Sequence, residues 1–194
     1  MIAIINTGCA NINSVRFAFE RLDAEVEIIS DPDKLSQFER AVLPGVGHAG
    51  VAMDRLTDKG WQNAIKAYSR PLLGICLGMQ LMCDFTEEGN VTTLGLVPGK
   101  LNELKSEDLT LPHMGWNQIK MLSDHPIFDG INANDQVYYV HSFAHVPNKY
   151  TLATSDYSTE FSAIIAKDNF IGMQFHPEKS AKVGETLLRN FLSL

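Results

Sequence analysis

Short apolar segments alternate with stretches of helical periodicity through the first half of the chain. The apolar segments predict β-strands at Met1–Asn6, Glu25–Ser30, Arg40–Leu43 and Leu72–Ile75. Apolar residues at helical spacing predict helices that begin at Asn13 or Ser14 as N-cap and that cover Val51–Leu56, Trp61–Tyr68 and Leu77–Phe85. Because strands and helices alternate with short links, we expect a parallel sheet with helices on both faces.

Strands dominate the second half of the chain. They are predicted at Asn117–Leu122, Gln136–Phe143, Thr151–Thr154, Phe161–Lys167 and Phe170–Phe175. Asp168-Asn169 between the last two is a hairpin signal, so we expect antiparallel strands added to the sheet. An amphipathic helix, Ser180–Leu192, closes the chain with Ser180 as its N-cap. Because no long linker interrupts this pattern, we expect a single α/β domain over residues 1–194.

Composition excludes several classes of function. Hydrophobic residues make up 45% and charged residues 20% of the 194 positions, as in an ordinary globular domain, and the formal net charge is −7. No basic stripe is present for nucleic acid or for an anionic membrane, and the apolar runs are too short to span a bilayer. The apolar start lacks a basic segment, which favours a first strand over a signal peptide.

The cysteines and histidines show no metal-ligand spacing. Cys9, Cys76 and Cys83 form an odd, sparse set, which favours free thiols in a reducing compartment, the cytoplasm, over disulfides or structural zinc. We therefore expect no metal and no cofactor. The histidines that we expect to be non-catalytic are His48, His113, His125 and His145.

Cys76 is the candidate nucleophile. It lies in Gly74-Ile75-Cys76-Leu77-Gly78, where an apolar strand meets a helix. A sharp turn at this point strains the corner residue, and the flanking glycines let neighbouring backbone approach closely. The side chain then projects from the sheet edge near a helix N-terminus, whose dipole favours the nucleophilic thiolate, and the Leu77 amide can donate to an oxyanion. The alternative is a buried cysteine in a glycine-rich turn.

His176 is the candidate base, in Gln174-Phe175-His176-Pro177-Glu178. A cysteine nucleophile needs a base, and histidine is the usual one near neutral pH. Glu178 can hold the imidazole through its second nitrogen. The alternative is a solvated His-Pro turn that follows a strand.

A third segment, Pro44-Gly45-Val46-Gly47, follows a predicted strand. Its two glycines allow a peptide group to turn its amide toward a ligand, and Val46 or Gly47 is the candidate second oxyanion donor. By itself the segment is better explained as an ordinary strand-ending turn. Together with Cys76 and His176 it completes the parts that acyl transfer requires.

The segments GICLGMQ, PGVG and FHPE together resemble the triad-type (class I) glutamine amidotransferases, which have a flavodoxin-like fold. PHMGWN at 112–117, YYVHSF at 138–143 and TGCANINSV at 7–15 resemble, within that family, the glutaminase subunits of imidazole glycerol phosphate synthase. The resemblance spans essentially the whole chain. It implies that Cys76, His176 and Glu178 form a catalytic triad that hydrolyses L-glutamine to glutamate and ammonia through a glutamyl thioester.

The resemblance also implies the surroundings of this triad. The oxyanion hole consists of backbone amides at Leu77 and at Val46 and Gly47. The glutamine-binding residues are Gly45, Gln80, Glu88, His141, Ser142 and Phe143. Ammonia passes to a separate (β/α)8-barrel cyclase subunit, which makes imidazole glycerol phosphate and an aminoimidazole carboxamide ribotide. The partner-facing residues are Asn11, Met114, Trp116, Tyr138 and Lys179, although Met114 and Trp116 are by side-chain type more often core residues.

Three other functions compete with this one. A cysteine hydrolase of the α/β-hydrolase type usually places its acid between the nucleophile and a late histidine, whereas Glu178 follows His176. A glutaminase subunit of a different synthase is disfavoured by PHMGWN and YYVHSF. A catalytically inactive binding subunit is unsupported, because the cysteine, the histidine and the glutamate are all present.

Overall fold

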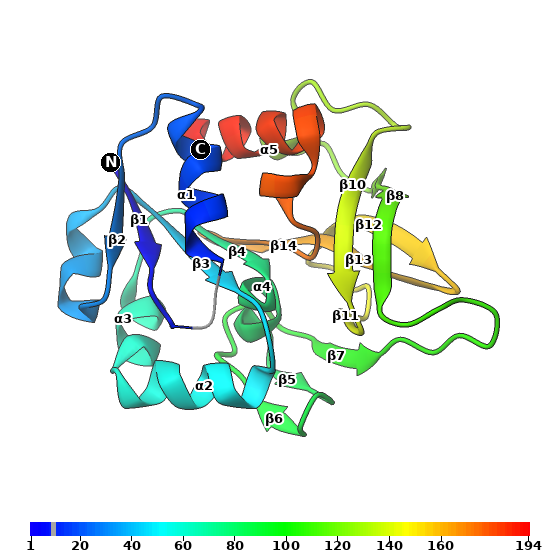
Figure 1. The fold of residues 1–194 in the computed structure, drawn as a ribbon, viewed down its shortest axis with the longest axis horizontal. Helices are drawn as coiled ribbons and strands as arrows, with labels where there is room; N and C mark the ends of the chain where they lie inside the picture. Colours follow the sequence, from blue (N-terminus) through cyan, green and yellow to red (C-terminus); the bar gives the residue numbers. More distant parts are fainter. Residues whose placement is uncertain (9–10) are drawn as a thin grey trace.

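The computed structural model describes residues 1–8 and 11–194. The strands of its central sheet are β1 (Ile2–Ile5), β2 (Val26–Ile29), β3 (Arg40–Gly45), β4 (Leu72–Cys76), β9 (Lys120–Met121), β12 (Thr151–Tyr157), β13 (Thr159–Lys167) and β14 (Phe170–Met173). They form an eight-stranded sheet in the order β2-β1-β3-β4-β14-β13-β12-β9 (Figure 1). Neighbours from β2 to β14 in this order are parallel, whereas β13, β12 and β9 are added antiparallel.

Helices cover both faces of this sheet (Figure 1). The longer helices are α1 (Ile12–Glu20), α2 (Ala49–Asp58) and α5 (Ala181–Ser193), and the shorter ones are α3 (Trp61–Ala67) and α4 (Leu77–Met82). Helices α1 and α5 contribute to one apolar core, and α2, α3 and α4 contribute to the other. The predicted α/β class, with a mostly parallel sheet and antiparallel strands from the second half of the chain, is therefore confirmed.

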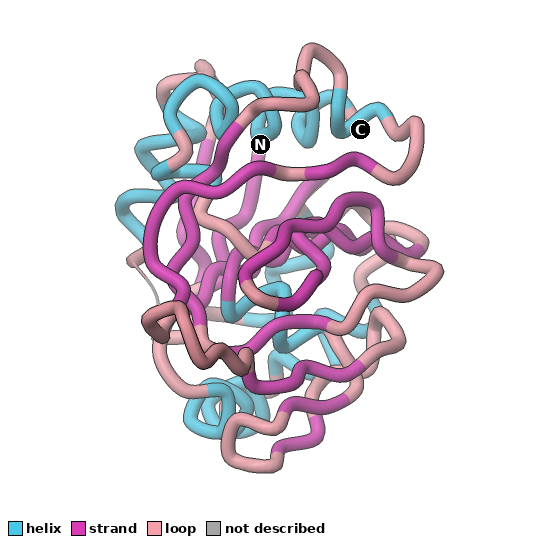
Figure 2. The backbone as a smooth tube through the Cα atoms, turned by 90° about the vertical axis from the view of Figure 1, so that its right-hand side faces the viewer, coloured by secondary structure: helices cyan, strands magenta, loops and turns pink. Residues whose placement is uncertain are grey.

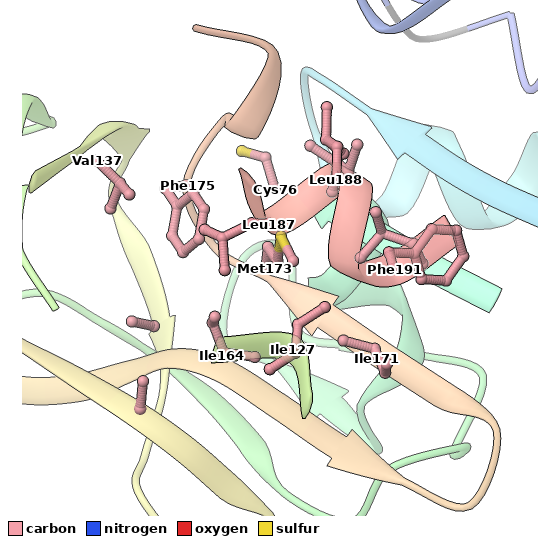
Figure 3. Packing of buried hydrophobic residues seen from close by; sticks show 14 of the residues in the cluster. Cys76, Ile127, Val137, Ile164, Ile171, Met173, Phe175, Leu187, Leu188 and Phe191 are labelled. Atoms are coloured by element: carbon pink, nitrogen blue, oxygen red, sulfur yellow. The ribbon is translucent and has the colours of Figure 1, made fainter. Parts of the chain in front are cut away.

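The sheet separates two cores because successive side chains of a strand point to opposite faces. Ile4 packs with Phe19 and Phe191 under α1 and α5, whereas Ile5 packs in the core that contains Trp61. The rings of Phe19 and Phe191 meet edge to face, with their centroids 6.4 Å apart. Figure 3 shows the first of these cores from close by, with Phe191 among the labelled side chains. Cys76 belongs to the same core, so the end of β4 is anchored by apolar packing.

Two smaller sheets lie beside the central one (Figure 2). Strands β8 (His113–Gln118) and β10 (Gln136–His141) form a two-stranded antiparallel ribbon. The four-stranded sheet contains β5 (Phe85–Thr86), β6 (Val91–Thr92), β7 (Lys100–Glu103) and β11 (Phe143–His145). The expectation that all strands of the second half extend the central sheet is therefore wrong for Gln136–Phe143 and for Asn117–Gln118, whereas Lys120–Met121 does join the central sheet as β9. Alternation of apolar and polar residues fixes which face of a strand is buried, but not which strand it pairs with.

Several predicted boundaries also move. Helix α1 begins at Ile12 with Asn11 as N-cap, rather than at Asn13 or Ser14. Helix α4 ends at Met82, because Cys83 is extended and Phe85 begins β5. The hairpin at Asp168-Asn169 is confirmed, since Lys167 pairs with Phe170 across it. Among the helices of the described residues, none is long and apolar enough to cross a membrane.

Candidate active site

Cys76 occupies a strained corner between β4 and α4. Its backbone adopts φ 52° and ψ −110°, a conformation that costs a residue with a Cβ about 1–3 kcal/mol. The flanking glycines make the corner compact. A Cβ on Gly78 would lie 1.8 Å from the carbonyl oxygen of Leu43, and a Cβ on Gly74 would lie 2.7 Å from the amide nitrogen of Met79. The G-x-C-x-G pattern therefore forms the sharp turn that the sequence predicts.

His176 and Glu178 form a buried pair beside this corner. His176 precedes the short 3-10 helix η3 (Pro177–Lys179), and its Nδ1 lies 2.8 Å from Oε1 of Glu178. Only 7% of the His176 side chain and 3% of the Glu178 side chain are exposed. With Nδ1 bound to Glu178, Nε2 is the ring nitrogen that remains to interact with Cys76 at the shared cavity. The structure thus brings the predicted nucleophile, base and acid together.

The charges around His176 favour its protonated form. Burial by itself lowers the pKa of His176, but the hydrogen bonds and charges of Cys76 and Glu178 outweigh burial and raise this pKa to about 10. A protonated imidazole that faces a thiol favours the thiolate, which is the nucleophilic form of cysteine. The pair can therefore supply both a nucleophile and the proton that a leaving amine needs.

A cavity of about 320 Å³ opens at Cys76 and His176. It also collects most of the residues predicted to hold the oxyanion and the glutamine, namely Val46, Gly47, Leu77, Gln80, Glu88, His141, Ser142 and Phe143. Gly45 lies behind the wall, where an added Cβ would be 2.9 Å from both the Gly78 amide nitrogen and the Leu77 Cβ. Gly45 therefore lets β3 approach the Cys76 corner closely. The next two residues along the chain, Val46 and Gly47, line the cavity.

Gln174 is a member of the site for which the sequence analysis states no role. Its Nε2 lies 3.9 Å from Sγ of Cys76, and its Oε1 accepts a hydrogen bond from Nε2 of Gln80 at 3.1 Å. The same Nε2 of Gln80 donates to the carbonyl oxygen of Phe143 at 2.9 Å. Gln174 is two residues before His176. Residues at this spacing in an extended chain point to the same face, so the spacing is the sequence signal that would have placed Gln174 beside His176.

His113 supports the wall of the cavity from behind. Its Nδ1 lies 3.0 Å from Nε2 of His141, and Nδ1 of His141 lies 2.9 Å from the carbonyl oxygen of Phe143. Burial lowers the pKa of His113 to about 4 and the pKa of His141 to about 3, so both rings are neutral at pH 7. His113 therefore holds His141 in place at the cavity wall. The sequence predicted only that His113 is not catalytic, and not this supporting role.

The other histidines make local contacts outside the triad. Nδ1 of His48 accepts from the Gly50 amide, Nδ1 of His125 accepts from the Ile127 amide, and Nδ1 of His145 lies 2.9 Å from Oγ of Ser162. In the described part of the chain, no group of three or more His, Cys, Asp or Glu residues is placed to hold a metal ion. Cys76 and Cys83 are free thiols, and Cys9 lies outside the described residues.

The predicted partner-facing residues all reach the surface. Met114 is 61% and Trp116 is 51% exposed, so neither is a core residue. Tyr138 pairs with Trp116 across the β8–β10 ribbon, with ring centroids 5.9 Å apart. Lys179 is exposed at the cavity that contains Cys76, and Asn11 is exposed before α1.

The chain is similar to known glutamine amidotransferases. Residues 3–194 match the family described as glutamine amidotransferase class-I. The chain is similar to imidazole glycerol phosphate synthase subunit HisH of Haemophilus influenzae, with 50% identity over 98% of this chain and 96% of the relative. It is also similar to subunit HisH of Pasteurella multocida, with 49% identity over 98% of this chain and 96% of that relative.

Solved structures share the fold at low sequence identity. PurLQS from Thermotoga maritima superimposes with a TM-score of 0.75 at 17% identity, over 99% of this chain and 97% of that one. A second structure, of a glutamine amidotransferase, gives a TM-score of 0.76 at 14% identity, over 99% of this chain and 97% of that one. These likenesses establish the architecture alone.

Proposed function

The chain belongs to the glutamine amidotransferase subunits of imidazole glycerol phosphate synthase, an enzyme of histidine biosynthesis, and we propose that it hydrolyses glutamine through Cys76, His176 and Glu178. The observation that carries the proposal is the 2.8 Å contact between His176 and Glu178 beside the Cys76 corner. A buried acid, an imidazole and a thiol in this order at one cavity are the parts of a nucleophilic hydrolase.

The first half of the reaction forms a thioester. Sγ of Cys76 attacks the side-chain amide carbon of glutamine, and the carbonyl oxygen becomes an oxyanion. The amides of Leu77 and of Val46 or Gly47 stabilise this charge, which exists only near the transition state. As the carbon–nitrogen bond breaks, His176 gives its proton to the leaving amine, which departs as ammonia.

The second half releases glutamate. The neutral His176 takes a proton from a water molecule, whose oxygen attacks the thioester carbon. Collapse of the second tetrahedral intermediate breaks the carbon–sulfur bond and returns the thiolate of Cys76. Glu178 holds Nδ1 of His176 throughout, so that Nε2 stays directed at the reacting atoms.

The cavity wall supports binding of an amino acid substrate. The carboxylate of Glu88 provides negative charge for the α-ammonium group of glutamine, while its Oε2 is fixed by the Ala49 amide at 2.7 Å. Gln80 supports the segment His141–Phe143 through its bond to the Phe143 carbonyl oxygen. These contacts place rigid polar groups around a site of suitable size for one free amino acid.

We also propose that the partner is a (β/α)8-barrel cyclase subunit that receives the ammonia. The proposed contact residues are Asn11, Met114, Trp116, Tyr138 and Lys179. The exposure of Met114 and Trp116 supports this face, because methionine and aromatic residues are enriched in protein interfaces. Trp116→Ala should weaken the complex by about 10- to 100-fold. Leu122→Ala, at a residue that is 50% exposed beyond β9, is the matched control and should leave the affinity unchanged.

A glutaminase subunit of a different synthase is the remaining alternative. It is disfavoured because the identity to the HisH subunits is 50% and 49% and extends over 98% of the chain. An α/β-hydrolase-type enzyme is disfavoured by the match of residues 3–194 to the class-I amidotransferase family.

One experiment tests the function. Glutamine hydrolysis is measured for the wild type, Cys76→Ala and Cys83→Ala, with the subunit alone and with its cyclase partner. Cys76→Ala should abolish glutamine hydrolysis and leave synthase activity that is driven by added ammonium salts. Cys83→Ala should retain both activities, and the wild type should be a poor glutaminase until the partner is added. Glutamine turnover by Cys76→Ala would exclude the proposed nucleophile, and full activity of the lone wild type would exclude activation by the partner.

A further inference from the structure

The backbone of Tyr138 is joined at both of its polar groups to the turn that carries His176. The carbonyl oxygen of Tyr138 accepts a hydrogen bond from the His176 amide at 2.9 Å. The amide of Tyr138 donates to Oγ of Ser180 at 3.0 Å. Tyr138 therefore ties strand β10 to the backbone of the turn that carries the base.

Ser180 completes a ring of hydrogen bonds that runs through Tyr138, His176 and Ser180. Its hydroxyl donates to the carbonyl oxygen of His176 at 2.7 Å, and its side chain is completely buried. The direction of each bond is fixed, because a carbonyl oxygen can only accept and a backbone amide can only donate. Three hydrogen bonds thus fix the amide and the carbonyl group of His176 relative to Tyr138.

Ser180 does not do what its position predicts. It is the residue before α5, where a serine side chain normally accepts a bond from a free amide of the first turn and stabilises the helix by about 1 kcal/mol. Within the described residues, its side chain makes no such capping bond. The hydroxyl instead donates to the His176 carbonyl oxygen and accepts from the Tyr138 amide. The serine at this position therefore serves the candidate active site and not the helix N-terminus.

We propose that Ser180 is a positioning residue for the catalytic base His176. The inference rests on the proposed function, since it assumes that His176 transfers protons. Without the hydroxyl, the amide of Tyr138 loses its acceptor in a buried place, while the carbonyl oxygen of His176 keeps the Lys179 amide as a donor at 3.0 Å. The turn then moves to satisfy the Tyr138 amide. A displacement of about 1 Å at a reacting group costs about 100-fold in rate. Tyr138 is also a proposed partner-facing residue, so the ring joins that face to the base.

The test compares two serines, one at each end of α5, whose hydroxyls both donate to the carbonyl oxygen four residues earlier. Oγ of Ser193 donates to the carbonyl oxygen of Arg189, four residues earlier, as Ser180 does to His176. Ser193 lies at the far end of α5, so Ser193→Ala is the matched control. Both variants are assayed in the complex with the cyclase, and rates are normalised to the amount of complex recovered by size-exclusion chromatography, which counts only folded and assembled protein.

Ser180→Ala should lower kcat for glutamine by about 10- to 100-fold and change KM by less than about 3-fold, because the proposed glutamine-binding residues Gln80, Glu88 and 141–143 lie outside the turn that moves. The rate at which iodoacetamide alkylates Cys76 should fall more at pH 6 than at pH 9, because a displaced imidazolium no longer favours the thiolate. Ser193→Ala should match the wild type in all of these. Ser180→Cys, scored by kcat and KM, takes the place of Ser180→Ala if the latter does not fold.

The outcomes separate this inference from the function on which it rests. If wild-type protein hydrolyses glutamine, Cys76→Ala does not, and Ser180→Ala behaves like Ser193→Ala, the positioning role of Ser180 is wrong and the proposed function stands. An unchanged ratio of alkylation rates at the two pH values also overturns the inference, because a variant that is merely less stable would give that result. If Cys76→Ala still hydrolyses glutamine, the proposed function itself fails.

Discussion

His113 and His141 form a buried pair in which Nδ1 of the first lies 3.0 Å from Nε2 of the second. The carbonyl oxygen of Phe143 can only accept, so Nδ1 of His141 carries a hydrogen and its Nε2 is an acceptor. His113 must then donate from Nδ1. Nitrogen-detected NMR at pH 7 should show both rings neutral with hydrogen on Nδ1, and a cationic ring would contradict this assignment.

The same pair makes the protein sensitive to acid. The unfolded chain protonates these histidines below about pH 6.5, whereas burial lowers the pKa of His113 to about 4 and that of His141 to about 3. The contribution of this pair to stability is therefore complete above pH 6.5 and is lost as the pH falls toward these values, at up to about 1.4 kcal/mol per pH unit for each histidine. Urea unfolding at pH 7 and pH 5 measures this loss.

Two variants show whether the pair is the source of the acid sensitivity. His113→Asn should lower the free energy of unfolding at pH 7 and should also shrink the difference between pH 7 and pH 5. His48→Gln, at an exposed histidine, should leave that difference unchanged. Equal differences in the two variants would show that other groups cause the acid sensitivity.

Cys76 should react with iodoacetamide faster than Cys83. Cys76 lies at the same cavity as His176, whereas Cys83 is fully buried and its Sγ donates to the Met79 carbonyl oxygen. Burial also raises the pKa of the Cys83 thiol. Peptide mapping after limiting reagent should find most of the label on Cys76. Preferential labelling of Cys83 would count against the proposed nucleophile.

Val46→Pro should separate the two candidate oxyanion donors. Proline has no amide hydrogen, so the change removes the donor, which typically costs about 10²–10³ in turnover. KM should change far less, because the charge exists only in the transition state. Recovery of the complex with the cyclase by size-exclusion chromatography is the control for folding and assembly. Turnover like that of the wild type would exclude the Val46 amide and leave Gly47, whose φ of 99° already turns its peptide away from ordinary strand geometry.

His176→Ala should cost more than Glu178→Gln. Removing the group that moves the proton costs about 10²–10⁴ in kcat. Glutamine at 178 retains an oxygen that can accept from Nδ1, so it preserves part of the orientation and loses the charge that favours the imidazolium. Steady-state kinetics of the two variants decide the order, and a larger loss in Glu178→Gln would reverse the assigned roles.

Gly78→Ala should destabilise the whole corner at Cys76. The new Cβ would lie 1.8 Å from the Leu43 carbonyl oxygen, so β3 or α4 must shift, at a cost of about 1–3 kcal/mol or more. Glutamine turnover should fall with stability. Gly50→Ala is the control, because its Cβ would meet only side-chain atoms at 3.4 Å or beyond, and helix α2 gains a better helix former. Similar effects in thermal unfolding would show that the close approach at Gly78 is unimportant.

The sequence by itself determined the parts of this protein that depend on local chemistry. Alternating strands and helices predicted the parallel sheet, because burial on both faces requires continuous apolar strands. The sharp corner at Cys76 was predicted from its neighbours Gly74 and Gly78, because only a residue without a Cβ tolerates the distances that the turn imposes at those two positions. The order of Cys76, His176 and Glu178 predicted the triad, since each needs the next for its chemistry.

Only the tertiary structure decided how distant segments meet. It paired β8 with β10 in a separate ribbon, which alternation cannot specify, because the pattern fixes the buried face and not the neighbour. It placed His113 behind His141 and directed the Ser180 hydroxyl to the backbone of His176 instead of to its own helix. These contacts join residues of different secondary-structure elements. Whether such residues come together depends on how the elements pack, and a local sequence pattern does not specify that packing.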